Sequence, residues 1–343
     1  MRVVAALSGG VDSSVAALLL RQAGCDVVGV FMRNGVASAP GKEKSCCSAA
    51  DARDAGRVAD RLGIPFYAVD YADEFSRLID HFAAEYRAGR TPNPCVLCNQ
   101  DLKFGHLLRF AASIDAGGVA TGHYARVVDG SLRRARDRHK DQTYYLFGVP
   151  RAALSQVRFP LGDLEKEEVR SLARDAGLAT ADKPESMEIC FVTSGDYRDV
   201  VRARGGAGRP GRFVDEAGAE LGRHGGVGGF TVGQRRGLPA LGEPRFVKHI
   251  DAASGDVVLC ARAGLASEGA LVRGVNWLVD RPTAALRAEV KVRAQSPAVP
   301  ARLESSEADT VQVRFDQPVA AVTPGQAAVF YDGDLVLGGG WID

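Results

Sequence analysis

The sequence predicts an α/β protein. We expect an N-terminal domain with a parallel sheet covered by helices on both faces, then a small β-rich domain and a C-terminal antiparallel barrel or sandwich. Short apolar runs alternate with amphipathic stretches over the first two hundred residues. The chain becomes rich in glycine near residue 205. From residue 269 onward, stretches of alternating apolar and polar residues are separated by proline and glycine turns.

The apolar patterns give the expected elements of the N-terminal domain. Strands are expected at 3–7, 27–32, 66–70 and 118–121, and helices at 13–22, 49–62, 74–88, 102–112 and 166–176. Gly177 follows the last helix directly, as is common at a helix end. A chain of 343 residues is longer than one core usually supports. We therefore expect three domains, at 1–203, 204–266 and 269–343.

The composition is that of an ordinary globular protein, with 46% hydrophobic and 25% charged residues. The sequence does not open with a basic segment and an apolar run, and nowhere do about 18 apolar residues follow one another. We therefore expect a cytoplasmic protein without a membrane partner. The net charge of +1 does not decide nucleic-acid binding, which needs only a basic face. Seven cysteines, an odd number, favour thiol chemistry, metal ligation or core packing over a disulfide scaffold.

The stretch ALSGGVDSSVAALLL at 6–20 joins the first expected strand to the first expected helix. Glycines at 9 and 10 let the backbone approach an anion, and the N–H groups and dipole of the helix start favour negative charge. The stretch lacks the lysine of a Walker loop and the spacing of a dinucleotide-binding loop. It therefore predicts a phosphate-binding loop of another kind. The alternative is a helix capped by Asp and Ser after a glycine turn.

The residues Ser8, Gly9, Gly10, Val11, Asp12 and Ser13 match S-G-G-x-D-S, the PP-loop of the ATP pyrophosphatases. Enzymes with this loop typically place AMP on a carbonyl oxygen and release pyrophosphate. Further motifs follow in order: TPNPCVLCNQDLKF (91–104), ATGHYARV (120–127), KDQTYYLF (140–147), ESMEICFV (185–192), FTVGQRRGL (230–238) and AVTPGQAAVFYDGDLVLGGG (321–340). In these motifs and their order, the sequence resembles the tRNA-specific 2-thiouridylase family over essentially its whole length.

The resemblance implies a Rossmann-like fold of the adenine nucleotide α-hydrolase type for the PP-loop domain and a β-barrel at the C-terminus. It implies an ATP-dependent tRNA-uridine 2-sulfurtransferase, which replaces the C2 oxygen of the wobble uridine in tRNAs for Lys, Glu and Gln. Adenylation turns that oxygen into a better leaving group, and a sulfur nucleophile then attacks the same carbon. The implied partners are tRNA and a persulfide donor or relay protein, and we expect a monomer.

The family's functional residues map onto matching positions of this chain. The resemblance makes Cys190 the persulfide carrier, Cys98 the nucleophile that forms a disulfide with it, and Asp12 the residue that activates ATP, together with Mg²⁺. Without the motif around it, Cys190 would be read as a small buried apolar residue. The implied ATP site is Ala6, Leu7, Ser8, Gly9, Gly10, Val11, Asp12, Ser13, Met32 and Gly122.

Cys95 stands where the family often has Asp, so the motif becomes C-x-x-C. Cys95 either replaces the acidic residue near the target base, or tunes Cys98 as a dithiol, or joins Cys98 and Cys190 in holding an iron–sulfur cluster. The adjacent Cys46 and Cys47 are spectators in a loop or take part in a sulfur relay.

A base that is to be modified must leave the stack, so we expect the uridine to flip toward Cys98. The resemblance implies tRNA contacts from Asn93, Pro94, Cys95, His123, Lys140, Asp141, Gln142, Arg293 and Gln326. The basic stretch 133–142 is suited to phosphate contacts. Ala294 departs from the family's Arg-Tyr pair, so a stacking contact is expected to be lost there.

Two other functions remain open at this point. Another PP-loop adenylating enzyme, such as an amide-forming ligase, would need no paired cysteines. A non-catalytic tRNA-binding sulfur carrier could keep the fold without adenylating its substrate.

Overall fold

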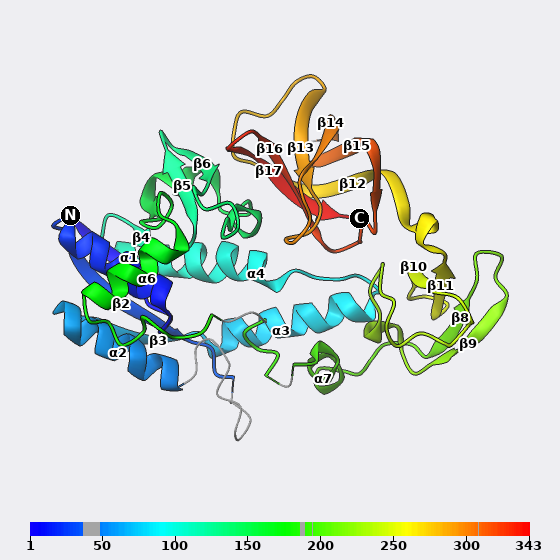
Figure 1. Ribbon diagram of the computed structural model, residues 1–343, viewed down its shortest axis with the longest axis horizontal. Coiled ribbons are helices and arrows are strands. Elements are labelled where there is room, and N and C mark those ends of the chain that lie inside the picture. Colours follow the sequence, from blue (N-terminus) through cyan, green and yellow to red (C-terminus); the bar gives the residue numbers. More distant parts are fainter. Residues whose placement is uncertain (37–48, 186–188, 194, 308) are drawn as a thin grey trace. The chain divides into compact units, whose positions relative to one another are not determined.

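The computed structural model describes residues 1–36, 49–185, 189–193, 195–307 and 309–343 (Figure 1). The chain forms two compact units. Unit 1 contains Met1–Leu78, Cys95–Gly195 and Asp334–Val336, and unit 2 contains Ile79–Pro94, Asp196–Gly333 and Leu337–Asp343. Within the described part of the chain, no helix is both long and apolar enough to span a membrane.

Unit 1 contains the predicted parallel sheet. Its strands are β1 (Arg2–Ala6), β2 (Asp26–Arg33), β3 (Phe66–Asp70), β4 (Val119–Ala120) and β7 (Val157–Arg158). Their order is β3-β2-β1-β4-β7, with all neighbours parallel. Strand β1 has β2 as its neighbour on one side and β4 on the other. The carboxyl ends of β1 and β4 therefore form the switch point at which α/β sheets bind ligands.

Alternating residues of β1 enter two different cores, which is why both faces of the sheet need covering. Val3 and Ala5 pack with α1 (Val11–Gln22) and α2 (Ala49–Leu62). Val4 packs on the opposite face with residues of α3 (Ala72–Arg87) and α5 (Leu107–Ser113). Helix α6 (Lys166–Asp175) packs against α1 through Val169 and Ala173. The predicted α/β class is confirmed.

The single helix expected at 102–112 is wrong in detail. A short α4 (Pro94–Leu97) leads into a π-helix, η1 (Cys98–His106), and α5 follows. Buried Leu102, Phe104 and Leu107 explain the apolar pattern that predicted a helix. A hairpin of β5 (Ala125–Val128) and β6 (Ser131–Arg134) and the short helices η2 (Thr143–Tyr145) and η3 (Arg151–Gln156) complete the unit.

In unit 2, helix α7 (Tyr197–Ala203) precedes a sheet of order β10-β11-β8-β9. These strands are β8 (Gly211–Val214), β9 (Glu220–His224), β10 (Phe246–Asp251) and β11 (Asp256–Cys260), with short helices η4 (Val227–Gly229) and η5 (Arg262–Leu265).

The C-terminal strands form the predicted antiparallel barrel. They are β12 (Ala266–Trp277), β13 (Leu286–Lys291), β14 (Val299–Glu307), β15 (Thr310–Ala320), β16 (Ala327–Asp332) and β17 (Leu335–Ile342). Strand β12 pairs with both β15 and β17, which closes the barrel. The domain boundaries expected near residues 204 and 267 stay predictions.

Candidate active site

The loop after β1 and the loop after β4 meet through their backbones. Gly9 has φ +73°, and a Cβ added to it would lie 2.4 Å from the Asp51 carbonyl oxygen. A Cβ on Gly122 would lie 2.6 Å from both Asp12 C and Ser13 N. Both positions therefore require glycine, for conformation and space at Gly9 and for space at Gly122. The close approach at Gly122 joins the two loops at the switch point of the sheet, and that at Gly9 joins the first loop to α2.

The hydroxyl groups of the loop hold its turn in place. Ser13 Oγ donates to Gly10 O at 3.1 Å and accepts from Ser8 N at 3.1 Å. Ser14 Oγ donates to Gly10 O at 2.8 Å and accepts from Thr180 Oγ1 at 2.9 Å. These bonds shape the backbone at the N-terminus of α1, where the N–H groups of the first turn favour an anion.

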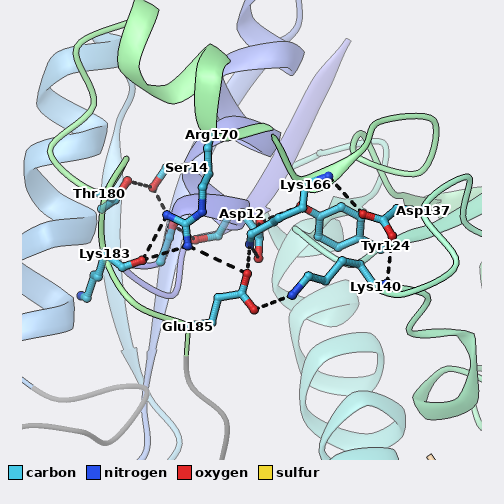
Figure 2. A network of polar contacts seen from close by, with 12 residues as sticks. Asp12, Ser14, Tyr124, Asp137, Lys140, Lys166, Arg170, Thr180, Lys183 and Glu185 are labelled. Atoms are coloured by element: carbon cyan, nitrogen blue, oxygen red, sulfur yellow. Dashed lines mark hydrogen bonds and ion pairs between the residues drawn. The ribbon is translucent and has the colours of Figure 1, made fainter. Parts of the chain in front are cut away.

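Asp12 lies in the first turn of α1 and is held by two side chains from distant parts of unit 1 (Figure 2). Lys166 Nζ lies 2.7 and 2.9 Å from the two carboxylate oxygens of Asp12. The Tyr124 hydroxyl donates to Asp12 Oδ1 at 3.0 Å. Burial and the Asp12 carboxylate raise the pKa of Tyr124, so its hydroxyl keeps the proton that it donates.

Glu185 extends this network to Lys140 and Arg170 (Figure 2). Its carboxylate lies 2.7 Å from Lys166 Nζ and 2.8 Å from Lys140 Nζ, with Arg170 at 4.0 Å. Burial alone would raise the pKa of Glu185, but hydrogen bonds from Lys140 and Lys166 outweigh burial and lower the pKa to about 2. Glu185 lies five residues before Cys190, so the two Cα atoms are within about 18 Å of one another.

We expect the Glu185→Gln variant to lose stability in a pH-dependent way. The pKa of Glu185 lies below its ordinary value of 4.5, so its contribution is fully present above pH 4.5 and is lost as the pH falls toward about 2. Urea unfolding near neutral pH should show a loss of about 1–2 kcal/mol, limited by partial exposure of the side chain. The difference in unfolding free energy between the variant and the native chain should become smaller in acid. The control is Glu167→Gln, an exposed carboxylate of α6. A gap that does not change with pH would contradict this account of Glu185.

A second lysine, Lys183, contacts the loop from a distant part of the chain. Lys183 Nζ lies 2.9 Å from Gly9 O, 2.7 Å from Asp51 and 2.6 Å from Asp54. Burial lowers the pKa of Lys183, but the hydrogen bonds to the two carboxylates outweigh burial and raise it. The loop lacks the lysine of a Walker motif, but Lys183 and Lys166 place ammonium groups beside it, each paired with two carboxylates in the structure.

The sequence did not single out Lys166, Lys183 or Glu185 as site residues. One signal was present at Lys166. It is the first residue of α6, where the helix dipole disfavours a cation, so a lysine there indicates a nearby anion.

The two predicted catalytic cysteines lie in unit 1 on the same face of the sheet. Cys98 begins η1, and both Cys98 and Cys190 pack against the core cluster around Val4, Val30 and Met32. Ala6, directly before the loop, packs against the same cluster. Cys98 and Cys190 are half-buried, and no disulfide joins the two in the structure. A disulfide between them stays a prediction. The side chain of Cys95 is exposed.

The iron–sulfur interpretation gains no support from the structure. Cys95, Cys98 and Cys190 all belong to the described residues, and within these no group of three or more His, Cys, Asp or Glu side chains could hold a metal ion. Cys46 and Cys47 lie outside the described residues.

Some residues of the predicted nucleotide site belong to the hydrophobic core. Leu7, Val11 and Met32 are buried, and the Met32 side chain extends from β2 into the core cluster around Val4 and Val30. Only their backbone atoms are therefore suited to ligand contact. Roles in ATP binding stay predictions for these residues and for the rest of the loop.

Several predicted tRNA contacts also have structural bonds in unit 1. Asp141 accepts from Ala135 N at 3.1 Å and from Thr143 Oγ1 at 2.8 Å. Gln142 accepts from Tyr124 N at 3.0 Å, and so supports the tyrosine that binds Asp12. Lys140, as described, binds Glu185. Lys140, Asp141 and Gln142 therefore stabilise the network beside the loop, in addition to any contact that they make with tRNA.

The residues of unit 2 that are predicted to contact tRNA also form hydrogen bonds within the protein. Arg293 donates to Val232 O at 2.8 Å and to Thr323 Oγ1 at 2.5 Å. Gln326 Nε2 donates to Thr91 O at 2.9 Å, shortly before buried Asn93. Their roles in RNA binding stay predictions.

Comparison with known proteins covers the whole chain. Residues 1–194 match the tRNA methyl transferase HUP domain, 199–261 the tRNA methyl transferase PRC-barrel domain, and 267–342 the aminomethyltransferase beta-barrel domain. The tRNA-specific 2-thiouridylase MnmA of Rhodospirillum centenum is 47% identical over 359 residues, which covers 99% of this chain and 91% of that protein. The protein of the same name from Geobacter metallireducens is 47% identical over 355 residues, covering 100% and 96%.

Proposed function

Because this chain belongs to the tRNA-specific 2-thiouridylase family, we propose that it uses ATP to replace the C2 oxygen of the wobble uridine in tRNAs for Lys, Glu and Gln by sulfur. One observation carries the proposal beyond family membership. The thiols of Cys98 and Cys190, from distant parts of the sequence, pack against one core cluster of the sheet, and Ala6, the residue directly before the loop, packs against the same cluster. An amide-forming ligase would need the loop but not the thiols.

The first step is adenylation of the uridine O2. The loop Ser8–Ser13 and Gly122 would hold ATP, with Lys166 and Lys183 supplying charge to the phosphates. The uridine O2 attacks the α-phosphorus, forming an O–P bond, and pyrophosphate leaves. The carboxylate oxygens of Asp12, which pair with Lys166 in the structure, would be the ligands for Mg²⁺, and the ion would supply positive charge to the phosphates.

The second step transfers sulfur. The terminal sulfur of a Cys190 persulfide attacks C2, a C–S bond forms, and AMP leaves with the former C2 oxygen. The Cys98 thiolate then attacks Cys190 Sγ, which forms the Cys98–Cys190 disulfide and breaks the bond between Cys190 Sγ and the transferred sulfur. The electron pair stays on that sulfur, now part of 2-thiouridine. An external thiol must reduce the disulfide before the next cycle.

The uridine must leave its stack to reach these groups. We assign Asn93, Pro94 and Cys95 to the base, and Lys140, Asp141 and Gln142 to the anticodon arm, with further contacts from His123, Arg293 and Gln326. The basic stretch 133–142 supports phosphate contacts near Lys140. The side chain of Cys95 is exposed, which leaves it accessible to a substrate. We further propose that the chain acts as a cytoplasmic monomer and receives its sulfur from a persulfide donor or relay protein.

The proposal is tested by incubating unmodified tRNA for Lys with the protein, ATP, Mg²⁺ and a persulfide donor, then digesting the RNA to nucleosides for mass spectrometry. We expect an ATP-dependent exchange of oxygen for sulfur at the wobble uridine, with AMP and pyrophosphate released. The Asp12→Asn variant should form neither AMP nor 2-thiouridine. ATP cleavage without sulfur gain would favour another adenylating enzyme. Tight tRNA binding without ATP cleavage would favour a sulfur carrier.

A further inference from the structure

The π-helix η1 places Cys98 and Lys103 on one face. In this helix the N–H of residue i+5 bonds to the carbonyl of residue i, as Leu107 N does to Leu102 O at its end. Residue i+5 therefore lies above residue i. In an α-helix of 3.6 residues per turn, the same two positions would point about 140° apart. The π-helical turn thus brings the Lys103 side chain to the side of the helix on which Cys98 lies.

His123 holds the Lys103 ammonium in place. Lys103 Nζ lies 3.5 Å from His123 Nε2, and Thr121 Oγ1 lies 2.7 Å from His123 Nδ1. Burial, and then Lys103, lower the pKa of His123 well below its ordinary value, so the ring is neutral. An ammonium group can only donate, so Nε2 accepts and the ring proton is on Nδ1, from which it is donated to buried Thr121. The rings of Phe104 and Phe159, with centroids 6.3 and 6.1 Å from that of His123, flank the imidazole.

Three influences act on the Cys98 thiol. Burial raises the pKa of Cys98, Lys103 lowers it, and Asp101 raises it. Lys103 is therefore the charged group that favours the thiolate, while Asp101 opposes it. A thiolate, and not a thiol, is the nucleophile in sulfur exchange.

We propose that Lys103 is a positioning residue that stabilises the Cys98 thiolate and that neutral His123, fixed by Thr121, holds Lys103 for this purpose. The inference rests on the proposed function, in which Cys98 is the nucleophile that attacks Cys190. The thiol proton leaves to solvent, and Lys103 keeps its own protons throughout. In this arrangement His123 acts through Lys103, a role additional to the tRNA contact implied by the family.

The test measures alkylation of Cys98 by iodoacetamide between about pH 6 and pH 10, with the Cys98 peptide quantified by mass spectrometry. Near neutral pH, Lys103→Met should slow alkylation of Cys98 roughly tenfold, because a smaller fraction of the thiol is then ionised. Its pH profile should move to higher pH, and Lys103→Arg should recover most of the rate because the charge is restored. A Lys103→Met profile that superimposes on that of the native chain overturns the proposal.

The exposed Asp101 supplies a variant of opposite sign. Asp101→Asn removes the charge that opposes the thiolate and should speed alkylation of Cys98 several-fold. If Lys103→Met does not fold, Lys103→Gln takes its place, and a Lys103→Gln profile that superimposes on that of the native chain overturns the proposal. Neither measurement uses tRNA or ATP. Shifted profiles in a protein that makes no 2-thiouridine would therefore reject the proposed function and leave the role of Lys103 standing.

Discussion

Replacement of Cys98 by alanine should abolish 2-thiouridine formation and leave tRNA affinity within a few-fold of the native value. Cys98 is one half-buried side chain against a large core, so its loss removes a reacting atom and little binding surface. In the proposed reaction the persulfide on Cys190 still attacks C2 of the uridine in this variant. No thiolate then breaks the bond between Cys190 Sγ and the transferred sulfur. The tRNA should remain attached to Cys190 through a disulfide-like link. Gel electrophoresis with and without reducing agent would detect that adduct.

Cys190→Ser should be equally inactive for a different reason. It carries no persulfide, so it should form no adduct with tRNA but should still release AMP and pyrophosphate when adenylated tRNA is hydrolysed. Cys25→Ala, which changes another half-buried free thiol of unit 1, is the matched control and should retain activity. Thiol mapping after one turnover of the native chain should find Cys98 joined to Cys190. Finding both thiols free without added reductant would rule out the release step.

The local parts of the site could be predicted from the sequence. The PP-loop follows β1 as expected, and the patterns placed β3 and α2 at the residues where the structure has them. These predictions succeeded because strand, glycine turn and helix are each encoded by neighbouring residues. Apolar spacing also indicated a helix after Cys98, but did not distinguish a π-helix from an α-helix, since buried residues at 102, 104 and 107 fit either.

The charged network could not be predicted in this way. Lys166 lies 154 positions from Asp12 in the sequence, and no periodicity links them. The partners of Glu185 come from the segment around Lys140 and from the start of α6, which meet only once the sheet has formed. The family motifs marked Lys140 and Gln142 for RNA binding. The structure adds that Gln142 accepts a hydrogen bond from Tyr124, which binds Asp12. Lys140 binds Glu185, which binds Lys166, the lysine paired with Asp12.

The other large effect is expected from a single methyl group. In Gly122→Ala the added Cβ would lie 2.6 Å from Asp12 C and Ser13 N, closer than carbon can approach backbone atoms. The neighbouring atoms belong to the start of α1, so no flexible side chain can move aside. Either the loop after β4 or the first turn of α1 must shift. We expect a loss of about 1–3 kcal/mol in the free energy of unfolding, and about 10²-fold lower activity because the phosphate-binding N–H groups and Asp12 move together.

A matched substitution separates this effect from a general response to alanine. Gly56 lies within α2, where an added Cβ would meet Phe66 at 3.8 Å, an ordinary contact. Gly56→Ala should therefore stabilise the protein by about 0.5–1 kcal/mol and leave ATP binding unchanged. Binding of a non-hydrolysable ATP analogue, measured by calorimetry for both variants, tests the difference. If Gly122→Ala bound the analogue as tightly as Gly56→Ala, the backbone contact between the two loops would not shape the phosphate site. The added methyl group would then have moved the loops apart without weakening ATP binding.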